Sequence, residues 1–342
     1  MAQFEINNLK KVYDGKKLGF ENFSLSISDG EFVVLLGATG SGKSAVLRTL
    51  CGLDAVTSGE IKMNEVVINE YLPKDRDMAV VFQSIPLYAT MNVYDNFAFG
   101  LKMRKVPKDK IDERVYSAAK LLGLEGVMSR KPKNLTLYEK YRALLGRAIV
   151  RNSNLILMDD PLSGLDKNNR AIIRNEIIKL QQRVKFTCLY TTRDASEAMM
   201  LADRIVYMEE GKIIQIATPD EIYNNPKTVS IARYIGLPKI NLIEGKIAEN
   251  EFTFAAGAIK TDKPNTHRAY LGIRAEDISL GGEYKAMAKK SEQAGDKFLV
   301  TINFAGDSND YYMFADSELT GDINISFGEH LNFYDAKTEE LL

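Results

Sequence analysis

The sequence predicts an α/β protein with a mostly parallel sheet, followed by a small all-β domain. Three observations support this fold class. Residues 31–36, 154–158 and 186–190 are short apolar runs with the length of buried strands. Helical patterns separate these runs, and strands that alternate with helices form mostly parallel sheets covered by helices on both faces. Beyond residue 236, apolar and polar positions alternate and no amphipathic helix is evident.

The predicted elements follow one another in a clear order. Residues 3–36 alternate polar and apolar positions around Gly and Asp turns, which indicates a β-rich start. Residues 45–51 predict a helix that ends at Gly52. Longer patterns predict amphipathic helices at 107–122 and 168–182. Their apolar faces are Ile111, Val115, Ala118 and Leu122 in the first, and Ile172, Ile173, Ile177 and Leu180 in the second.

The sequence changes in character near Gly236-Leu-Pro238. Downstream, residues 298–304 alternate apolar with other side chains, and clusters of Gly, Asn and Asp separate such runs. This pattern predicts an all-β, OB-like domain of roughly 100 residues. A chain of 342 residues is long enough for two separate cores. We therefore expect two domains, residues 1–235 and 236–342.

The composition excludes several classes of function. A formal net charge of −1 predicts no bulk attraction to nucleic acid or to anionic lipid. Residues 1–11 contain no apolar signal core, and no apolar run approaches the ~20 residues that span a bilayer. Any membrane role is therefore expected to come through a partner subunit. Cys51 and Cys188 lack metal-ligand spacing and are interpreted as core residues, which suits a reducing, cytoplasmic setting.

A phosphate-binding loop follows the first apolar strand. The pattern G-x-x-x-x-G-K-[ST] is specific when it follows a strand and opens a helix, as it does here. Its glycines allow backbone N–H groups to surround phosphate oxygens, and the helix N-terminus adds a positive dipole end. Lys43 would contact the β- and γ-phosphates and Ser44 would bind Mg²⁺. The loop consists of Gly37, Ala38, Thr39, Gly40, Ser41, Gly42, Lys43 and Ser44.

Asp159 ends the apolar run at 154–158. Its carboxylate is therefore expected at the carboxyl edge of the sheet, where ligands bind in open α/β folds. We expect it to hold Mg²⁺ through water, although an aspartate in an ordinary surface turn is the alternative.

Several further motifs carry a family resemblance. In these segments and in the phosphate-binding loop, the chain resembles the ATP-binding subunits of ABC transporters, and among them those of oligosaccharide and glycerol-3-phosphate importers. The resemblance covers nearly the whole chain. The segments are 77–83, 92–102, 145–151, 162–166, 198–204, 235–241 and 271–276.

The resemblance implies an ABC-type core with a helical subdomain at about 85–150 and a dimer of ATPase subunits that encloses two ATP molecules with Mg²⁺. Tyr13 would stack on adenine, Gln83 would reach Mg²⁺ or the attacking water, and Asp166 would lie at the dimer seam. Two alternatives stay open: Tyr13 as a packing residue of an edge strand, and Gln83 as an unengaged loop amide.

The resemblance also implies partners. These are membrane permease subunits that dock on the region from Gln83 to Lys102, and a second ATP-binding subunit, either another copy of this chain or an intact relative. An extracellular solute-binding protein would take part indirectly, and no nucleic acid is expected. The location implied is the cytoplasmic face of the membrane, as a peripheral subunit. The C-terminal domain would serve regulation or dimerisation.

Two catalytic positions depart from the family. Asp160 stands where the family has a glutamate that polarises water, and aspartate is one methylene shorter. A general base in reach contributes roughly 10²–10⁴ in rate. Arg193 stands where the family has a histidine, and no histidine occurs before residue 267. Because arginine donates but cannot accept a proton, Arg193 could hold the γ-phosphate while contributing little to turnover. A solvent-exposed arginine is the alternative.

The third departure is in the signature loop. The family's L-S-G-G-Q is replaced by Leu135, Thr136, Leu137, Tyr138 and Glu139. Glycines in this loop permit close approach to the γ-phosphate of the opposite subunit, which bulky side chains should block. Two interpretations stay open: a capped helix start without a role in nucleotide contact, and a modified loop that still works.

The first functional hypothesis is an energising subunit of a sugar-type importer that binds MgATP and hydrolyses it slowly or only with a partner. The second is a regulatory or scaffold subunit that binds the nucleotide without hydrolysis, so that the assignment as an ATPase stays open. A third, a non-transport ATPase such as a translation factor, is disfavoured by the C-terminal β domain and the single cassette.

Overall fold

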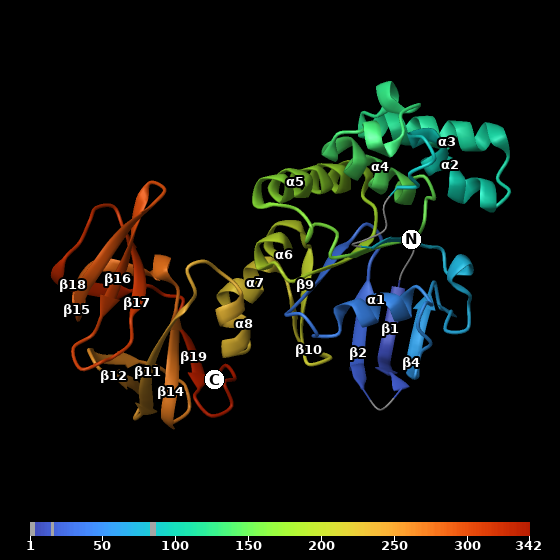
Figure 1. The fold of residues 1–342 in the computed structure, drawn as a ribbon. Helices are drawn as coiled ribbons and strands as arrows, with labels where there is room; N and C mark the ends of the chain where they lie inside the picture. The colour runs from blue at the N-terminus through green and yellow to red at the C-terminus, as the bar shows by residue number, and fades with distance from the viewer. Residues whose placement is uncertain (1–3, 15–16, 83–86) are drawn as a thin grey trace. The chain divides into compact units, whose positions relative to one another are not determined.

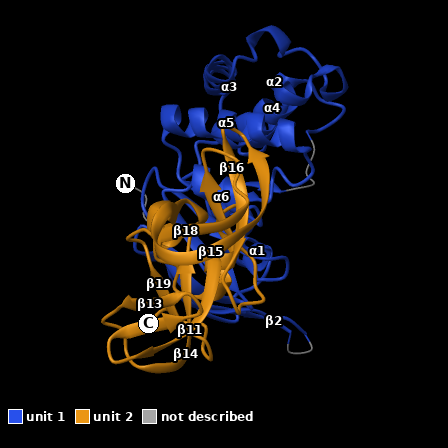
Figure 2. Cartoon of the chain, turned by 90° about the vertical axis from the view of Figure 1, so that its left-hand side faces the viewer, with its two compact units in different colours: residues 1–216 blue, residues 217–342 orange. Residues whose placement is uncertain are grey.

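The computed structural model describes residues 4–14, 17–82 and 87–342. The chain forms two compact units, Met1–Ile216 and Ala217–Leu342 (Figure 2). The second unit therefore includes about 20 residues before the predicted division at 235/236. These residues form two short helices, α7 (Pro219–Asn224) and α8 (Val229–Tyr234).

A six-stranded sheet in the order β10-β9-β3-β8-β7-β6 forms the centre of the first unit (Figure 1). Its pairings β3–β8, β3–β9, β7–β8 and β6–β7 are parallel, which confirms the predicted parallel sheet. All residues of β3 and β8 are buried, as expected for strands covered on both faces. The strands are β3 (Phe32–Leu36), β6 (Met78–Phe82), β7 (Leu155–Asp159), β8 (Cys188–Thr192), β9 (Arg204–Glu209) and β10 (Lys212–Ala217).

An antiparallel sheet in the order β2-β1-β4-β5 confirms the predicted β-rich start. Its apolar side chains share one hydrophobic core with those of α1 and of the parallel sheet. The strands are β1 (Phe4–Val12), β2 (Leu18–Ile27), β4 (Ser58–Met63) and β5 (Val66–Val67).

The helices of the first unit agree with the predicted patterns to within about two residues. The segments predicted at 45–51, 107–122 and 168–182 correspond to α1 (Lys43–Leu50), α3 (Lys108–Leu122) and α5 (Lys167–Val184). Helices α2 (Val93–Met103), α3 and α4 (Leu137–Ile149) lie within the range predicted for a helical subdomain, and α6 (Ala195–Leu201) follows β8.

Two antiparallel sheets build the second unit, in the orders β13-β12-β11-β14-β19 and β17-β16-β15-β18. Their facing side chains form one aromatic-rich core, consistent with the predicted all-β domain. The strands are β11 (Asn241–Ala248), β12 (Glu251–Phe254), β13 (Gly257–Lys260), β14 (Thr266–Ile273), β15 (Ile278–Ala294), β16 (Lys297–Asn303), β17 (Tyr311–Ala315), β18 (Gly321–Phe327) and β19 (Asn332–Asp335).

Four short 3₁₀ helices complete the described elements: η2 (Pro73–Asp75), η3 (Glu125–Val127), η4 (Pro132–Asn134) and η5 (Ala275–Asp277). Both cysteines are free and buried, as predicted for core residues. Within the described ranges, no helix combines the length and apolar character required to cross a membrane.

Candidate nucleotide-binding site

The predicted phosphate-binding loop connects β3 to α1. Gly40 and Gly42 adopt left-handed backbone conformations, with φ of 88° and 99°. A Cβ atom at Gly42 would lie 2.6 Å from the carbonyl oxygen of Gly19, and one at Gly37 would lie 2.2 Å from that of Met208. At Gly37 and Gly42, the loop can therefore follow this path only with glycine.

Lys43 lies in the first turn of α1 with its side chain folded over the loop. Its Nζ atom donates hydrogen bonds to the carbonyl oxygens of Gly37 and Ala38, at 2.7 and 2.8 Å, and to Oγ of Ser41 at 3.0 Å. Burial lowers the pKa of Lys43 to about 8, against the opposing effect of two nearby carboxylates, those of Asp160 and Asp159. The cation is thus held where a phosphate group would meet it.

Ser44 and Asp159 meet at the carboxyl end of β7. The Ser44 hydroxyl donates to Oδ1 of Asp159 at 2.9 Å, and the Thr191 hydroxyl donates to the same oxygen at 2.8 Å. Hydroxyl and carboxylate oxygens are the donor set that Mg²⁺ prefers, so the residues present fit this ion. Gln83, the third predicted magnesium residue, lies outside the described residues.

Asp160 follows β7 in a left-handed conformation, with φ of 44°. Its backbone N–H donates to the carbonyl oxygen of Thr191 at 3.0 Å and to Oγ1 of Thr191 at 3.1 Å. Burial raises the pKa of the Asp160 carboxyl, while the charge of Arg193 acts in the opposite direction. Arg193 is an exposed residue, yet its charge acts on the carboxylate at the predicted catalytic position.

The segment in place of the signature begins helix α4. Oγ1 of Thr136 accepts a hydrogen bond from the backbone N–H of Glu139 at 3.3 Å, and Oε2 of Glu139 accepts one from the backbone N–H of Thr136 at 2.7 Å. This reciprocal pair is a capping box. Leu135 is buried, whereas Leu137 and Tyr138 are half-buried. The helix start is therefore capped, and a role in nucleotide contact stays a prediction.

Tyr13 follows strand β1, and its ring is held from two sides. Its hydroxyl donates to Oδ2 of Asp54 at 2.7 Å, and Nζ of Lys11 lies 4.9 Å from the ring centroid. Burial and the hydrogen bond to Asp54 raise the pKa of Tyr13 to about 12. The aromatic face has a defined orientation, and its stacking on adenine stays a prediction.

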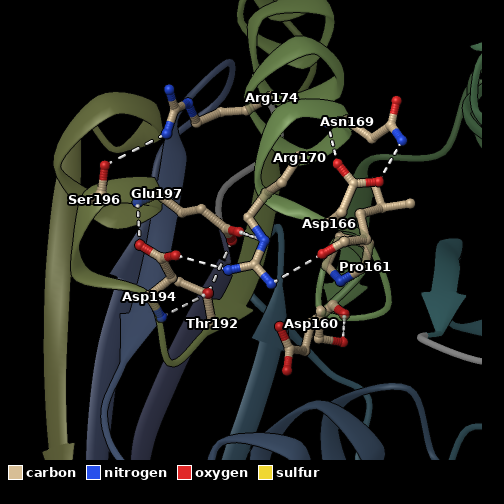
Figure 3. Close-up of polar contacts among 12 residues, drawn as sticks. Asp160, Pro161, Asp166, Asn169, Arg170, Arg174, Thr192, Asp194, Ser196 and Glu197 are labelled. Carbon is tan, nitrogen blue, oxygen red and sulfur yellow. Dashed lines mark hydrogen bonds and ion pairs between the residues drawn. The ribbon is translucent and has the colours of Figure 1, made fainter.

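Asp166 is the N-cap of α5. Its Oδ1 atom accepts a hydrogen bond from the backbone N–H of Asn169 at 3.1 Å (Figure 3). The same oxygen accepts one from the backbone N–H of Asn168, also at 3.1 Å. The carboxylate is exposed and the pKa of Asp166 is lowered, chiefly by the bond from the Asn169 backbone. Its place at a dimer seam stays a prediction.

Sequence reasoning missed a polar cluster beside these residues. Arg170 of α5 pairs with Asp194 and Glu197, which cap and belong to α6 (Figure 3). Glu197 is only 1% exposed and also accepts hydrogen bonds from Tyr190 and Thr192. The available signal was an acidic residue, Glu197, between Ser196 and Ala198 on a short helix that is otherwise mostly apolar.

The glycine loop between strand and helix, the buried lysine and the adjoining serine–aspartate pair define a P-loop nucleotide-binding domain. Comparisons with known proteins specify its class. The ABC transporter family model matches residues 20–163. The oligosaccharides import ATP-binding protein MsmX of Bacillus subtilis is 39% identical, over 99% of both chains. This chain belongs to the ABC transporter family, as one of its ATP-binding subunits.

Two further proteins are similar to this chain. The sn-glycerol-3-phosphate import ATP-binding protein UgpC of Rhizobium meliloti is 42% identical, over 83% of this chain and 80% of the relative. The solved structure of cbiO1 from Clostridium perfringens, part of the ABC transporter complex cbiONQ, is 25% identical. It covers 65% of this chain and 90% of its own with a TM-score of 0.59, which confirms the ABC-type fold.

Proposed function

We propose that this chain is the ATP-binding subunit of an importer for sugars or related solutes, located peripherally at the cytoplasmic face of the membrane. The substrate class rests on the relatives named for oligosaccharides and sn-glycerol-3-phosphate. The contact between Ser44 and Asp159 carries the proposal for MgATP, because it joins the phosphate-binding loop to a carboxylate at 2.9 Å. Lys43 would contact the phosphates, and bound Mg²⁺ would neutralise charge on them.

We propose further that hydrolysis by this chain is weakened. Asp160 is shorter than the family's glutamate, and Arg193 cannot accept a proton. The start of α4 has no glycine, and its capping box fixes Thr136 and Glu139 to each other. Paired with itself, the chain would carry all three changes at both sites. If the chain paired with an intact relative, each site would contain some residues that match the family's pattern. Turnover would then depend on that relative.

A groove between β6 and helices α2 and α4 supports docking of a permease helix. It encloses about 940 Å³. Its lining includes aromatic and basic side chains: the Arg147 guanidinium carbon lies 4.5 Å from the centroid of the Tyr88 ring, and Phe97, Phe99 and Arg151 are among the lining residues. The groove overlaps the region from Gln83 to Lys102 that was predicted to receive the permease.

The decisive experiment is titration calorimetry of the full chain with MgATP. We expect binding, and Lys43→Ala should reduce the affinity by about 100-fold or more, because a charge-assisted contact to the phosphates is lost. Absence of binding by the unaltered chain would refute the proposal. Affinity purification from solubilised membranes should recover permease subunits, and their absence would refute the transport role.

The capping box at the signature position favours a second candidate, a nucleotide-binding regulatory subunit that does not hydrolyse ATP. Steady phosphate release by the purified complex separates the two. Turnover that Lys43→Ala in this chain abolishes would exclude the regulatory candidate. Turnover unaffected by Lys43→Ala, with MgATP still bound by the unaltered chain, would favour it.

A further inference from the structure

We infer that Arg170 is a positioning residue that sets the place of Arg193 and couples it to the segment Leu162–Asp166. The inference rests on the proposed binding of MgATP and on the contact with the γ-phosphate that the sequence predicts for Arg193. It assigns a role to the polar cluster between α5 and α6, which the proposed function does not use (Figure 3).

The guanidinium of Arg170 bridges three parts of the chain. Its Nη1 atom donates to Oδ2 of Asp194 at 2.9 Å. Its Nη2 atom donates to the carbonyl oxygen of Leu165 at 3.4 Å, and Nε lies 3.6 Å from Oε1 of Glu197. A planar guanidinium presents several donors in fixed directions, so one side chain can hold all three partners at once.

Both neighbours of Arg193 are fixed by the same cluster. The Thr192 hydroxyl donates to Oε2 of Glu197 at 2.9 Å and accepts the backbone N–H of Asp194 at 3.0 Å. Oδ1 of Asp194 caps α6 by accepting the backbone N–H of Glu197 at 3.2 Å. The backbone of Arg193 therefore lies between two residues whose side chains are both hydrogen-bonded to Glu197. The side chain of Asp194 is also hydrogen-bonded to Arg170.

Glu197 makes this arrangement sensitive to Arg170. The carboxylate is 1% exposed, so its charge requires compensation from neighbouring groups. Arg170 is the cation paired with it among the described contacts, and the hydroxyls of Tyr190 and Thr192 supply the hydrogen bonds. Removing the guanidinium would leave a buried carboxylate without its counterion and loosen the turn that Glu197 holds.

The contact with Leu165 connects this turn to the segment before α5. Asp166, the next residue, caps α5 through its carboxylate. A displacement of the segment Leu162–Asp166 would therefore move the carbonyl oxygen of Leu165, which accepts a hydrogen bond from Arg170. Through Arg170 it would also move the turn that carries Arg193. Asp166 is the residue predicted at a dimer seam. Contact between subunits at this seam would therefore change the position of Arg193 at the γ-phosphate site, through Arg170.

The test compares five variants of the full chain: Arg170→Gln, Arg170→Lys, Arg193→Gln, the double variant Arg170→Gln/Arg193→Gln, and Arg174→Gln as the matched control. Arg174 lies one helical turn further along α5 and donates to Ser196 at 3.4 Å, which holds neither neighbour of Arg193 (Figure 3). For each variant we would measure the affinities for MgATP and MgADP, and amide hydrogen exchange over residues 192–198.

Arg193→Gln should reduce the ratio of MgATP to MgADP affinity by about tenfold, because a charge-assisted contact to the γ-phosphate is lost. Arg170→Gln should reduce the same ratio by several-fold, and the double variant should match Arg193→Gln, since coupled residues are not additive. Exchange over 192–198 should rise about tenfold in Arg170→Gln and less in Arg170→Lys. Arg174→Gln should behave as the unaltered chain.

An unchanged affinity ratio in Arg193→Gln, additive losses in the double variant, or unchanged exchange in Arg170→Gln would overturn the inference. If Arg170→Gln does not fold, Arg170→Lys decides, because lysine can reach only one of the three acceptors and should show partial losses. Failure of the unaltered chain to bind either nucleotide would refute the proposed function instead, and the exchange measurement would still test the positioning by Arg170.

Discussion

The hydroxyl of Ser44 and the carboxylate of Asp159, 115 residues apart in sequence, are joined by a hydrogen bond of 2.9 Å. Ser44 lies in the first turn of helix α1, and Asp159 ends strand β7. Because β8 lies between β7 and β3, the Thr191 hydroxyl of β8 reaches the same carboxylate oxygen, at 2.8 Å. Two hydroxyls and one carboxylate thus converge at the sheet edge beside the phosphate-binding loop.

This arrangement predicts a metal-dependent affinity for ATP. In Asp159→Asn the amide oxygen can still accept the two hydroxyl hydrogen bonds, but the charge that attracts Mg²⁺ is lost. We expect the gain in ATP affinity caused by Mg²⁺ to shrink by about tenfold or more, as for other losses at metal sites. Titrations with Mg²⁺ and with EDTA measure this gain. A variant that keeps the full gain would show that Asp159 does not support the metal.

The loop glycines predict a contrast between Gly42 and Gly40. Both have positive φ, at 99° and 88°, but a Cβ at Gly42 would lie 2.6 Å from a backbone oxygen, whereas a Cβ at Gly40 would meet no atom of the described residues within 4 Å. Gly40→Ala should cost about 1 kcal/mol of unfolding free energy from backbone strain, and Gly42→Ala about 3 kcal/mol because a steric clash is added. Thermal unfolding without nucleotide measures both. Equal losses would contradict the close approach.

The parallel sheet could be predicted because three of its strands, β3, β7 and β8, coincide with or overlap short apolar runs. The last predicted strand, at 186–190, was displaced by two residues, since β8 spans Cys188–Thr192. The reason is the pairing of β8 with β3, in which Cys188 lies opposite Phe32. Phe186 instead packs its ring against Phe32, with centroids 6.3 Å apart. Apolar composition alone cannot distinguish a strand residue from a packing residue just before it.

The phosphate-binding loop could also be predicted, because a local pattern of glycines and lysine determines it. The cluster around Arg170 could not, since Arg170 and Asp194 are 24 residues apart and belong to different helices. Each acidic or basic residue alone resembles an ordinary helix-surface charge. Only the fold shows that Glu197 is buried and requires the guanidinium.

The packing of α2 against α4 predicts opposite effects of alanine at two helical glycines. A Cβ at Gly146 would lie 2.1 Å from the Phe97 ring, which is buried, whereas one at Gly100 would be in ordinary contact with Arg151 at 3.8 Å. Gly146→Ala should lower the unfolding free energy by about 2 kcal/mol through overpacking. Gly100→Ala should raise it by about 0.5 kcal/mol through helix propensity. Thermal unfolding of both variants checks the signs, and stabilisation by both would contradict the tight contact.

Glu197 predicts a specific dependence of stability on pH. Burial raises its pKa above the ordinary value of 4.5. The folded state therefore binds the proton more tightly than the unfolded state, and the stability contributed by protonation is lost as pH rises from 4.5 through the folded pKa. As pH rises through this range, the melting temperature of the unaltered chain should therefore fall relative to that of Glu197→Gln.

Glu139 is a control of opposite sign. The hydrogen bond from the Thr136 backbone is the main cause that lowers the pKa of Glu139, so its contribution is present above pH 4.5 and is lost as pH falls through the folded pKa. The difference between the unaltered chain and Glu139→Gln should therefore shrink on acidification. If both differences moved in the same direction with pH, the burial of a charged Glu197 would be refuted.

Asp160 and Arg193 predict that turnover can be restored. Replacing Asp160 by Glu extends the carboxylate by one methylene, and replacing Arg193 by His supplies a group that can accept a proton. The left-handed backbone at Asp160, with φ of 44°, suits aspartate better than glutamate, so part of the gain is offset by about 1 kcal/mol of strain. Since a general base in reach is worth roughly 10²–10⁴ in rate, Asp160→Glu/Arg193→His should still raise kcat by about tenfold or more. KM for MgATP should change little.

Phosphate release by the complex purified through this chain measures both constants. The double variant with Lys43→Ala added gives the background rate. A kcat that stays at the level of the unaltered chain would show that these two positions do not limit hydrolysis.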